Sequence, residues 1–358
     1  MIDLTITGKM PQNKRLPEPL NDKPLLTIAI PTYNRANLLE LCLDSIIEQV
    51  RRSPESIEIL LFNNASTDNT SEVARRYIAE YPNIHYSDND KNYGPDYNIA
   101  KCFRLANAKY VWVFSDDDLM LPRAIERIMP LLKGEDLGII ALAVSFYKDS
   151  INKSLYPYAA LSHRLYHNPI ELAKEIHFWL TYISGVIVNK EVAFEHGVYY
   201  PSEDSYLIQL GWVIPALFSN YPSAKVETPL ILGRALPVLD FKLFYVFGTS
   251  YPAVLKKLVY LNVLPTDAME MLIDSIITKY FVFYISPSYQ YNHGERPLLI
   301  LGKAFWNRRT FWLYLFPIFV RRAILRISTT AKEKTFSTAK GLLRIILFTR
   351  ISADSKNL

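Results

Sequence analysis

The sequence predicts an α/β fold with a mostly parallel central sheet, followed by a helical, basic C-terminal region. Short apolar runs alternate with segments of helical periodicity from residue 25 to residue 146, which is typical of parallel strands with helical crossovers. Beyond about residue 229 the apolar segments become long and aromatic, with little strand pattern. Residues 301–358 hold 12 Lys and Arg against two acids, a net charge of +10, whereas the whole chain carries +5.

The expected strands and helices alternate along the chain. We expect strands at 25–31, 57–62, 84–86, 110–114, 137–146 and 182–188, and helices at 37–50, 71–80, 96–106, 122–132 and 206–217. Four later segments are expected to be helical, namely 241–264, 268–285, 297–306 and 310–327. Ligands of such sheets bind beyond the carboxyl ends of the strands, so the residues directly after each strand are the first place to look for a site.

Length and composition limit the class of protein. At 358 residues the chain exceeds one ordinary domain, and we expect a polar tail at 1–23, a main domain at 24–228 and a helical region at 229–358. Half of the residues are apolar, which excludes wholesale disorder. The two cysteines, Cys42 and Cys102, allow no disulfide framework or zinc spacing and favour a reducing compartment. We expect neither a signal peptide nor a membrane-spanning segment, since no apolar run reaches about 18 residues.

Three consecutive aspartates, Asp116, Asp117 and Asp118, directly follow the strand expected at 110–114. Adjacent carboxylates repel one another, and a divalent cation relieves that repulsion. Mg²⁺ and Mn²⁺ prefer oxygen ligands and commonly bridge one or two protein carboxylates to substrate phosphates. The triplet therefore predicts a metal and diphosphate site, and the alternative is a solvated turn that caps the next helix.

Three more polar clusters come after strands of the predicted sheet. They are Pro31-Thr32-Tyr33-Asn34-Arg35, the segment from Asn63 to Thr70, and Asn92-Tyr93-Gly94-Pro95-Asp96-Tyr97-Asn98. Their side chains can donate hydrogen bonds, stack on a base or contact phosphate, and a helix N-terminus after the third cluster can face an anion. Each cluster taken alone is equally well explained as a helix cap.

In order and spacing, these four segments resemble the motifs of family 2 glycosyltransferases over about residues 25–143. The resemblance implies that 24–228 is a catalytic domain of the Rossmann-like GT-A fold. It also implies a nucleotide-diphosphate sugar donor, a Mg²⁺ or Mn²⁺ ion, and inversion at the anomeric carbon. The Asn-rich second motif and Ser-Asp-Asp-Asp look most like the abequosyltransferase-like enzymes of bacterial surface polysaccharides.

The resemblance also assigns site residues. It implies metal ligands among Asp116, Asp117 and Asp118, and nucleotide-sugar contacts from Pro31, Thr32, Tyr33, Asn34, Arg35, Asn63, Asp68, Asn92, Gly94, Asn98, Ser115, Asp116 and Asp117. The family usually has Asp where Asn63 stands, to accept the uracil N3–H; an amide suits either uracil or cytosine. The family's Asp-x-Asp motif fits either Ser115 with Asp117 or Asp116 with Asp118.

An inverting transferase needs a carboxylate beside the acceptor hydroxyl. The family supplies it from an acidic pair well after the metal motif, and Glu203-Asp204 begins 85 residues after Asp118. Asp204 matches the usual base and Glu203 is its partner. The basic residues that commonly come after the pair are absent from 205–212, so an ordinary acidic helix start is the alternative.

The basic C-terminal region suggests an anionic membrane surface as a partner. The apolar run 311–320 lies between Arg308-Arg309 and Arg321-Arg322, and a second run, 342–348, lies between Lys340 and Arg350. Both are too short to cross a bilayer but suit a segment lying in its interface. Packing on the catalytic domain is the alternative, and nucleic acid is not an expected partner because no recognisable module accompanies the charge.

Together these observations predict an inverting hexosyl- or deoxyhexosyltransferase bound peripherally to the cytoplasmic face of the cell membrane. It would move a sugar from a UDP or CDP donor to a hydroxyl of a lipid-linked oligosaccharide in O-antigen, capsule or exopolysaccharide synthesis. One alternative is a sugar nucleotidyltransferase, but the glycine-rich loop usual in that class is absent from residues 27–35. The other is a non-catalytic, membrane-associated scaffold with the same fold.

Overall fold

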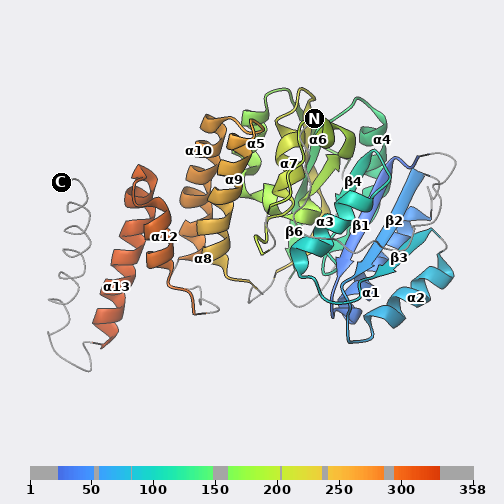
Figure 1. Ribbon diagram of the computed structural model, residues 1–358, viewed down its shortest axis with the longest axis horizontal. Coiled ribbons are helices and arrows are strands. Elements are labelled where there is room, and N and C mark those ends of the chain that lie inside the picture. Colours follow the sequence, from blue (N-terminus) through green and yellow to red (C-terminus); the bar gives the residue numbers. More distant parts are fainter. Residues whose placement is uncertain are drawn as a thin grey trace. The chain divides into compact units, whose positions relative to one another are not determined.

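The computed structural model describes residues 23–51, 56–81, 83–147, 160–201, 204–235, 241–285 and 294–330, with side chains to residue 324 (Figure 1). The chain divides into two compact units, Met1–Ile276 and Ile277–Leu358. Three predicted features lie outside the described residues: the polar N-terminal tail up to residue 22, Glu203, and the basic segment 331–358 with its apolar run 342–348.

The larger unit is built on one mixed sheet, whose described strands run in the order β3-β2-β1-β4-β8-β6-β9-β5, with β7 paired to β9. The strands are β1 (Leu26–Thr32), β2 (Ile57–Asn63), β3 (Ile84–Asp88), β4 (Tyr110–Val113), β5 (Leu119–Met120), β6 (Ile139–Tyr147), β7 (His163–Tyr166), β8 (Val186–Asn189) and β9 (Ser223–Arg234). Pairing is parallel through β3-β2-β1-β4 and between β6 and β9, while β8, β5 and β7 run antiparallel to their neighbours. The predicted α/β fold with a parallel nucleus is confirmed.

Helices connect the parallel strands and cover the sheet (Figure 1). They are α1 (Ala36–Val50), α2 (Thr70–Glu80), α3 (Pro95–Leu105) and α4 (Ala124–Lys133). The apolar face of α1, including Leu39, Leu43 and Ile46, is fully buried in one core with Ile28 and Ile59 of the neighbouring strands. Burial of this face stabilises both elements, since about 1.5–3 kcal/mol accompanies each large apolar side chain removed from water.

Shorter helices fill the second half of this unit. They are α5 (Pro169–Ile176), η3 (His177–Thr181), η4 (Ile183–Gly185), α6 (Lys190–Glu195), α7 (Leu210–Leu217), α8 (Leu243–Tyr245), η5 (Val246–Ser250), α9 (Tyr251–Tyr260) and α10 (Thr266–Ser275). The helix expected from residue 206 begins later, at Leu210. Positive φ angles at Asp204 and Tyr206, of 72° and 57°, keep the preceding turn out of the right-handed helical conformation.

The long strand β9 was not predicted from the sequence. It continues from Ser223 to Arg234, across the expected domain boundary between residues 228 and 229. Its register with β6 changes from Leu142↔Val226 to Val144↔Ile231, so four residues of β9 project as a bulge beside one residue of β6. This bulge interrupts the alternation of side chains along β9. The sequence of the segment therefore lacks the regular alternation that predicts a strand.

The helical character expected of the C-terminal region is confirmed from Leu243 onward, whereas residues 229–234 belong to β9. The helices α10 and α11 (Val282–Tyr284) are joined by a π-helical segment, η6 (Ile276–Phe281). The smaller unit continues with α12 (Pro297–Phe305), η7 (Phe311–Leu315) and α13 (Phe316–Thr330). Its interior contains Phe281 and Phe305, whose ring centroids are 6.1 Å apart. Within the described part of the chain, no helix combines the length and the apolar character needed to cross a bilayer.

Candidate functional site

The four polar clusters meet at the carboxyl edge of β1, β2, β3 and β4. In the parallel register Thr32 lies opposite Asn63, and Asn63 lies opposite Asp88. The loops beyond these strand ends are joined by hydrogen bonds: Thr67 N donates to Asn34 Oδ1 at 2.7 Å, and Asn64 Nδ2 donates to Asn92 Oδ1 at 2.8 Å. The clusters thus form one surface, as the strand order predicts.

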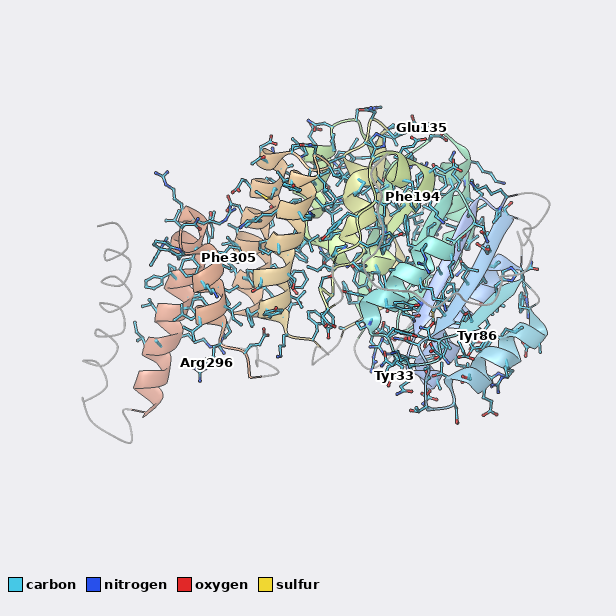
Figure 2. All side chains as sticks on the ribbon, in the orientation of Figure 1. Tyr33, Tyr86, Glu135, Phe194, Arg296 and Phe305 are labelled. Carbon is cyan, nitrogen blue, oxygen red and sulfur yellow. The ribbon has the colours of Figure 1, made fainter. Side chains whose placement is uncertain are left out.

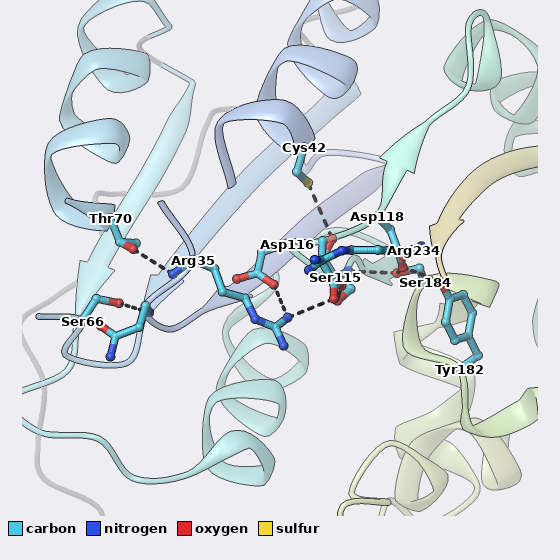
Figure 3. Close-up of polar contacts among 12 residues, drawn as sticks. Arg35, Cys42, Ser66, Thr70, Ser115, Asp116, Asp118, Tyr182, Ser184 and Arg234 are labelled. Atoms are coloured by element: carbon cyan, nitrogen blue, oxygen red, sulfur yellow. Dashed lines mark hydrogen bonds and ion pairs between the residues drawn. The ribbon is translucent and has the colours of Figure 1, made fainter. Parts of the chain in front are cut away.

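Arg35 connects the first cluster to the aspartates (Figure 3). Its Nη1 lies 2.9 Å from Asp116 Oδ1 and 3.2 Å from Asp117 Oδ2. The loop turns toward the aspartates at Asn34, whose φ of 51° is the left-handed conformation that Asn tolerates best among ordinary residues. One guanidinium therefore faces two adjacent carboxylates and offsets part of their mutual repulsion.

The first two aspartates share this charged corner. Ser115 Oγ donates to Asp117 Oδ1 at 2.5 Å, and Asp116 Oδ2 is buried without a hydrogen-bond partner. Burial raises the pKa of Asp116 to about 6; Arg35 opposes this rise, and Asp117 adds to it. Thr32 Oγ1, at the end of β1, is also buried; it makes no hydrogen bond of good geometry, but it is close enough to Asp116 to lower the pKa of that carboxyl. A cation placed here would relieve both the repulsion and the unpartnered carboxylate oxygen.

Asp118 has a different set of partners. Its Oδ2 accepts from Tyr182 Oη at 2.7 Å and from Ser184 Oγ at 2.6 Å, and its Oδ1 accepts from Arg234 N at 3.2 Å (Figure 3). Burial and the neighbouring Asp117 raise the pKa of Asp118 to about 7, against these hydrogen bonds. Both of its oxygens are used to join the loop after β4 to η4 and to the end of β9.

The carboxylates fit a metal that binds with its substrate. No three His, Cys, Asp or Glu side chains gather as potential ligands in the part of the chain that the structure describes. Asp116 and Asp117 offer two carboxylates beside one guanidinium, and Asp116 Oδ2 has no other partner. Mg²⁺ commonly binds in this way, with one or two carboxylates and the remaining positions taken by waters and phosphates.

The end of β2 holds Asn63, whose side chain is fully buried. Its Nδ2 lies 2.7 Å from Asp88 Oδ1, 3.1 Å from Tyr86 Oη and 2.9 Å from Ser71 Oγ, and its Oδ1 accepts from Ser66. The amide is therefore satisfied within the protein. Asp88, at the end of β3, is exposed, and its Oδ1 accepts from both Asn63 Nδ2 and Tyr86 Oη, the latter at 2.6 Å.

Other predicted site residues shape the loops. Asp68 accepts hydrogen bonds from Ala36 N at 3.1 Å and Thr70 N at 3.0 Å, so it fixes the first turns of α1 and α2. Asn98 is buried and donates to Phe62 O at 2.9 Å. Asn92 and Gly94 both contact Asn64, whereas Pro31 is half-buried within β1 and Tyr33 is 40% exposed at its end. Tyr33, Asp68 and Asn92 are exposed, and Tyr33 is the aromatic side chain of this group that a ligand could stack on.

Asp204 lies exposed in the turn that comes before α7. Asp96, in the first turn of α3, accepts from Ser205 Oγ at 2.8 Å and from Tyr206 N at 2.9 Å. Burial raises the pKa of Asp96, whose other carboxylate oxygen is buried without a hydrogen-bond partner. These bonds hold a turn with two left-handed residues, and such strain is commonly retained where a side chain must be presented in one direction.

Tyr199 and Gly211, which come before and after Asp204 in the sequence, make a contact that admits only glycine at position 211. Tyr199 N donates to Gly211 O at 2.8 Å, and a Cβ on Gly211 would lie 1.6 Å from Tyr199 O. Among the described residues next to Asp204, Ser205 and Tyr206 are thus held by Asp96.

Several residues of this edge were missed by reasoning from the sequence. Tyr182, Ser184 and Arg234 reach Asp118 from segments that carry no recognisable motif. Asp88 was missed for a different reason, because it ends a strand just as the other polar clusters do. The rule that ligands bind beyond the carboxyl ends of the strands applies to Asp88 as well as to those clusters.

Comparison with solved structures places the fold in a known class. The Staphylococcus aureus protein TarS (residues 1–349), solved in complex with UDP-GlcNAc, superposes with a TM-score of 0.58 at 14% identity. The match covers 78% of this chain and 80% of that one. Another crystal structure of the same TarS segment gives a TM-score of 0.54. The larger unit is therefore an α/β domain of the GT-A class.

Comparison with sequences identifies the family. Residues 27–195 match the family described as Glycosyl transferase family 2, and this part of the chain is a family 2 glycosyltransferase domain. The abequosyltransferase RfbV of Salmonella typhimurium is 41% identical over 97 residues, 27% of this chain and 29% of that protein. An uncharacterised glycosyltransferase of Mycoplasma pneumoniae, the MG025 homolog, is 30% identical over 148 residues, 41% and 44% of the two chains. The matches span less than half of either relative.

Proposed function

We propose that this protein is an inverting glycosyltransferase that moves a sugar from a nucleotide-diphosphate donor to an acceptor hydroxyl. The observation that supports it most is the corner formed by Arg35, Asp116 and Asp117 at the carboxyl edge of a family 2 domain. This corner combines a cation with two carboxylates, one of which has a buried oxygen without a hydrogen-bond partner. Such a set of charges suits a diphosphate that arrives together with Mg²⁺ or Mn²⁺.

The leaving diphosphate is the group that needs charge stabilisation. When bound, the divalent ion would neutralise the charge that develops on the diphosphate as the glycosidic bond breaks. Asp116 and Asp117 would hold that ion, and Ser115 would fix the orientation of the Asp117 carboxylate through its 2.5 Å hydrogen bond. Arg35 would turn from the carboxylates toward the phosphate oxygens, because a guanidinium binds either group through the same N–H donors. Asp118 would keep the loop in place.

Asp204 would remove the proton of the acceptor hydroxyl. It is an exposed carboxylate directly before Ser205 and Tyr206, both of which donate to Asp96. A general base must come within hydrogen-bond distance of the proton that it abstracts, and a constrained loop favours that geometry. Glu203, its neighbour in the sequence, is the other carboxylate proposed for this step.

The nucleobase would contact Asp88 and stack on Tyr33. Asn63 is fully buried, and its amide is directed at Asp88, whose carboxylate takes the acceptor role that the family usually gives to the residue at position 63. A carboxylate only accepts hydrogen bonds, so it matches the N3–H of uracil better than the unprotonated N3 of cytosine. Of the two bases that remained open, this arrangement favours uracil.

Asp88→Asn is therefore expected to weaken UDP binding by about tenfold or more and to change CDP binding less, since a hydrogen bond to a charged group contributes about 1.5–3 kcal/mol. Asp90→Asn is a matched control, because Asp90 is also exposed but its carboxylate accepts from Tyr93 Oη, whereas that of Asp88 accepts from Asn63. Titration calorimetry with both nucleotides provides the measurement. Unchanged UDP affinity in the Asp88 variant would show that the base lies elsewhere.

The proposed acceptor is a lipid-linked saccharide at the cytoplasmic membrane face, in the synthesis of a bacterial polysaccharide. The likeness to an abequosyltransferase supports the polysaccharide, and the smaller unit supports the membrane surface. There Trp306 and Leu313 are 57% and 70% exposed, and the Arg308-Arg309 pair lies between them in the sequence. Exposed aromatic and aliphatic side chains near arginines suit the interface of an anionic bilayer.

Nucleotide-dependent stabilisation tests the proposed function. Thermal unfolding would be followed with UDP, CDP, GDP and dTDP and with the corresponding nucleoside triphosphates, each with and without Mn²⁺. One diphosphate with Mn²⁺ is expected to stabilise the protein by about 2.7 kcal/mol at about 100 times its dissociation constant. Stabilisation by nucleoside triphosphates alone would favour a nucleotidyltransferase, and no response to any nucleotide would favour a scaffold without turnover.

A further inference from the structure

A pair of exposed aromatic side chains lies on the larger unit at the end of β6. Phe146 of β6 and Trp179 of η3 are stacked, with ring centroids 5.7 Å apart, and are 45% and 40% exposed. Tyr182 packs edge-on against both rings, at centroid distances of 6.1 Å and 6.0 Å. Stacked aromatic rings left open to water are uncommon away from binding surfaces, because they expose apolar area that folding otherwise removes.

This aromatic pair is next to the aspartates. The hydroxyl of Tyr182, whose ring supports both members of the pair, donates to Asp118 Oδ2 at 2.7 Å. Tyr147, the neighbour of Phe146 in β6, directs its hydroxyl at the backbone oxygen of Asp117 at 3.5 Å. One tyrosine therefore separates the exposed rings from the aspartate triplet.

The backbone of β9 is shaped to admit these rings. A Cβ on Gly233 would lie 2.6 Å from Tyr182 Oη and 2.8 Å from Phe146 Cε1, closer than real Cβ contacts. Because the next residue, Arg234, donates its backbone N–H to Asp118, the strand cannot move away without breaking that bond. Phe146 and Tyr182 are therefore held by close packing against a strand that is itself tied to the aspartates.

We propose that Phe146 and Trp179 form the binding platform for the sugar ring of the acceptor, which stacks its apolar C–H face on them. The inference rests on the proposed function. The acceptor hydroxyl must approach the sugar that is attached to the diphosphate, so the acceptor lies beside Asp116 and Asp117. Among the described residues, the aromatic pair is an exposed apolar surface that connects to that corner through Tyr182 and Asp118. A saccharide fits it better than a lipid chain, since Tyr182, which packs on both rings, brings a hydroxyl and the Asp118 carboxylate close to them.

Saccharide binding tests the platform. Saturation-transfer NMR would be recorded with the methyl glycosides of glucose, galactose, mannose, rhamnose and N-acetylglucosamine, in the presence of UDP, CDP and Mn²⁺. At least one glycoside is expected to bind wild-type protein through the C–H protons of one ring face, and Trp179→Ala or Phe146→Ala should weaken that binding about tenfold. Phe194→Ala is the matched control, because Phe194 is 50% exposed on α6, away from Tyr33 (Figure 2).

The outcomes separate this inference from the proposed function. Equal binding by wild type and by the Trp179 and Phe146 variants would overturn the platform, as would the absence of binding by every glycoside to the wild-type protein. Nucleotide-dependent thermal stabilisation should be the same in wild type, Trp179→Ala and Phe194→Ala, which shows that the variants fold and keep the donor site. If wild type binds a glycoside on these rings but shows no nucleotide response, the donor assignment fails and the saccharide site stands.

Discussion

Replacing Asp117 by Asn is expected to lower turnover by about 10²–10³-fold with little effect on folding. The substitution keeps the size of the side chain and removes one negative charge from the corner shared with Arg35 and Asp116. The effect belongs to the transition state, because the missing charge weakens the hold on the ion that stabilises the departing diphosphate. Release of nucleoside diphosphate at saturating nucleotide sugar and Mn²⁺ gives the rate.

Two further variants make this result specific. Asp136→Asn removes an exposed carboxylate that pairs with Lys109 outside the site, and it should leave turnover unchanged. Asp118→Asn presents an amide to two hydroxyl donors and a backbone N–H, so it should lower the free energy of unfolding by about 1–3 kcal/mol. A wild-type rate in Asp117→Asn would remove Asp117 from the metal and diphosphate site.

Replacing Asp204 by Asn is expected to reduce transfer to the acceptor by about 10²–10⁴-fold, the usual contribution of a positioned general base. Nucleotide binding should be unchanged, because Asp204 is assigned to the acceptor and not to the donor. The two are measured separately, as the rate of transfer at saturating substrates and as the dissociation constant of the nucleoside diphosphate.

Glu135→Gln is the control for this variant. Glu135 is an exposed carboxylate near the opposite edge of the larger unit from Tyr33 (Figure 2). Its replacement should affect neither quantity. If Asp204→Asn transfers sugar at the wild-type rate, the base is another residue, and the constrained loop around Asp96 and Ser205 has a structural role only.

Much of the fold is determined by local pattern. The strands β1 and β2 and the helix α1 begin and end within about two residues of the expected positions, because their periodicity and their flanking polar residues are features of short segments. The meeting of the polar clusters was also predictable, since carboxyl ends of parallel neighbours share one edge. The link from Arg35 to Asp116 is one consequence of that geometry.

The remainder depends on contacts between distant segments. Asp118 differs from its two neighbours only because Tyr182, Ser184 and Arg234 reach it, and these lie 64, 66 and 116 residues away in the sequence. The burial of Asn63 likewise depends on Tyr86 and Asp88. Three identical residues in a row carry no local pattern that distinguishes one aspartate from the next. The sequence therefore fits both registers of the metal motif, Ser115 with Asp117 and Asp116 with Asp118, equally well.

The surroundings of the three aspartates support different roles for Asp116 and Asp117 than for Asp118. Asp116 and Asp117 are available to hold a cation with Arg35 beside them, whereas both oxygens of Asp118 are occupied in joining three segments. We propose that the first two aspartates act on the diphosphate and that the third fixes the loop. The aromatic pair beside Tyr182 would then receive the acceptor next to that loop.

Metal-dependent release of nucleoside diphosphate is the most direct test of whether Asp116 and Asp117 hold a divalent ion that acts on the diphosphate. Wild-type protein would be incubated with UDP-sugars and CDP-sugars in Mn²⁺, then with excess EDTA, and then with Mn²⁺ restored. We expect the wild-type protein to release UDP or CDP in Mn²⁺, to stop in EDTA and to recover when the ion is restored. We expect little release by Asp117→Asn in any condition. Release that continues at the same rate in EDTA, or that is equal in Asp117→Asn, would contradict the metal and diphosphate site proposed at Asp116 and Asp117.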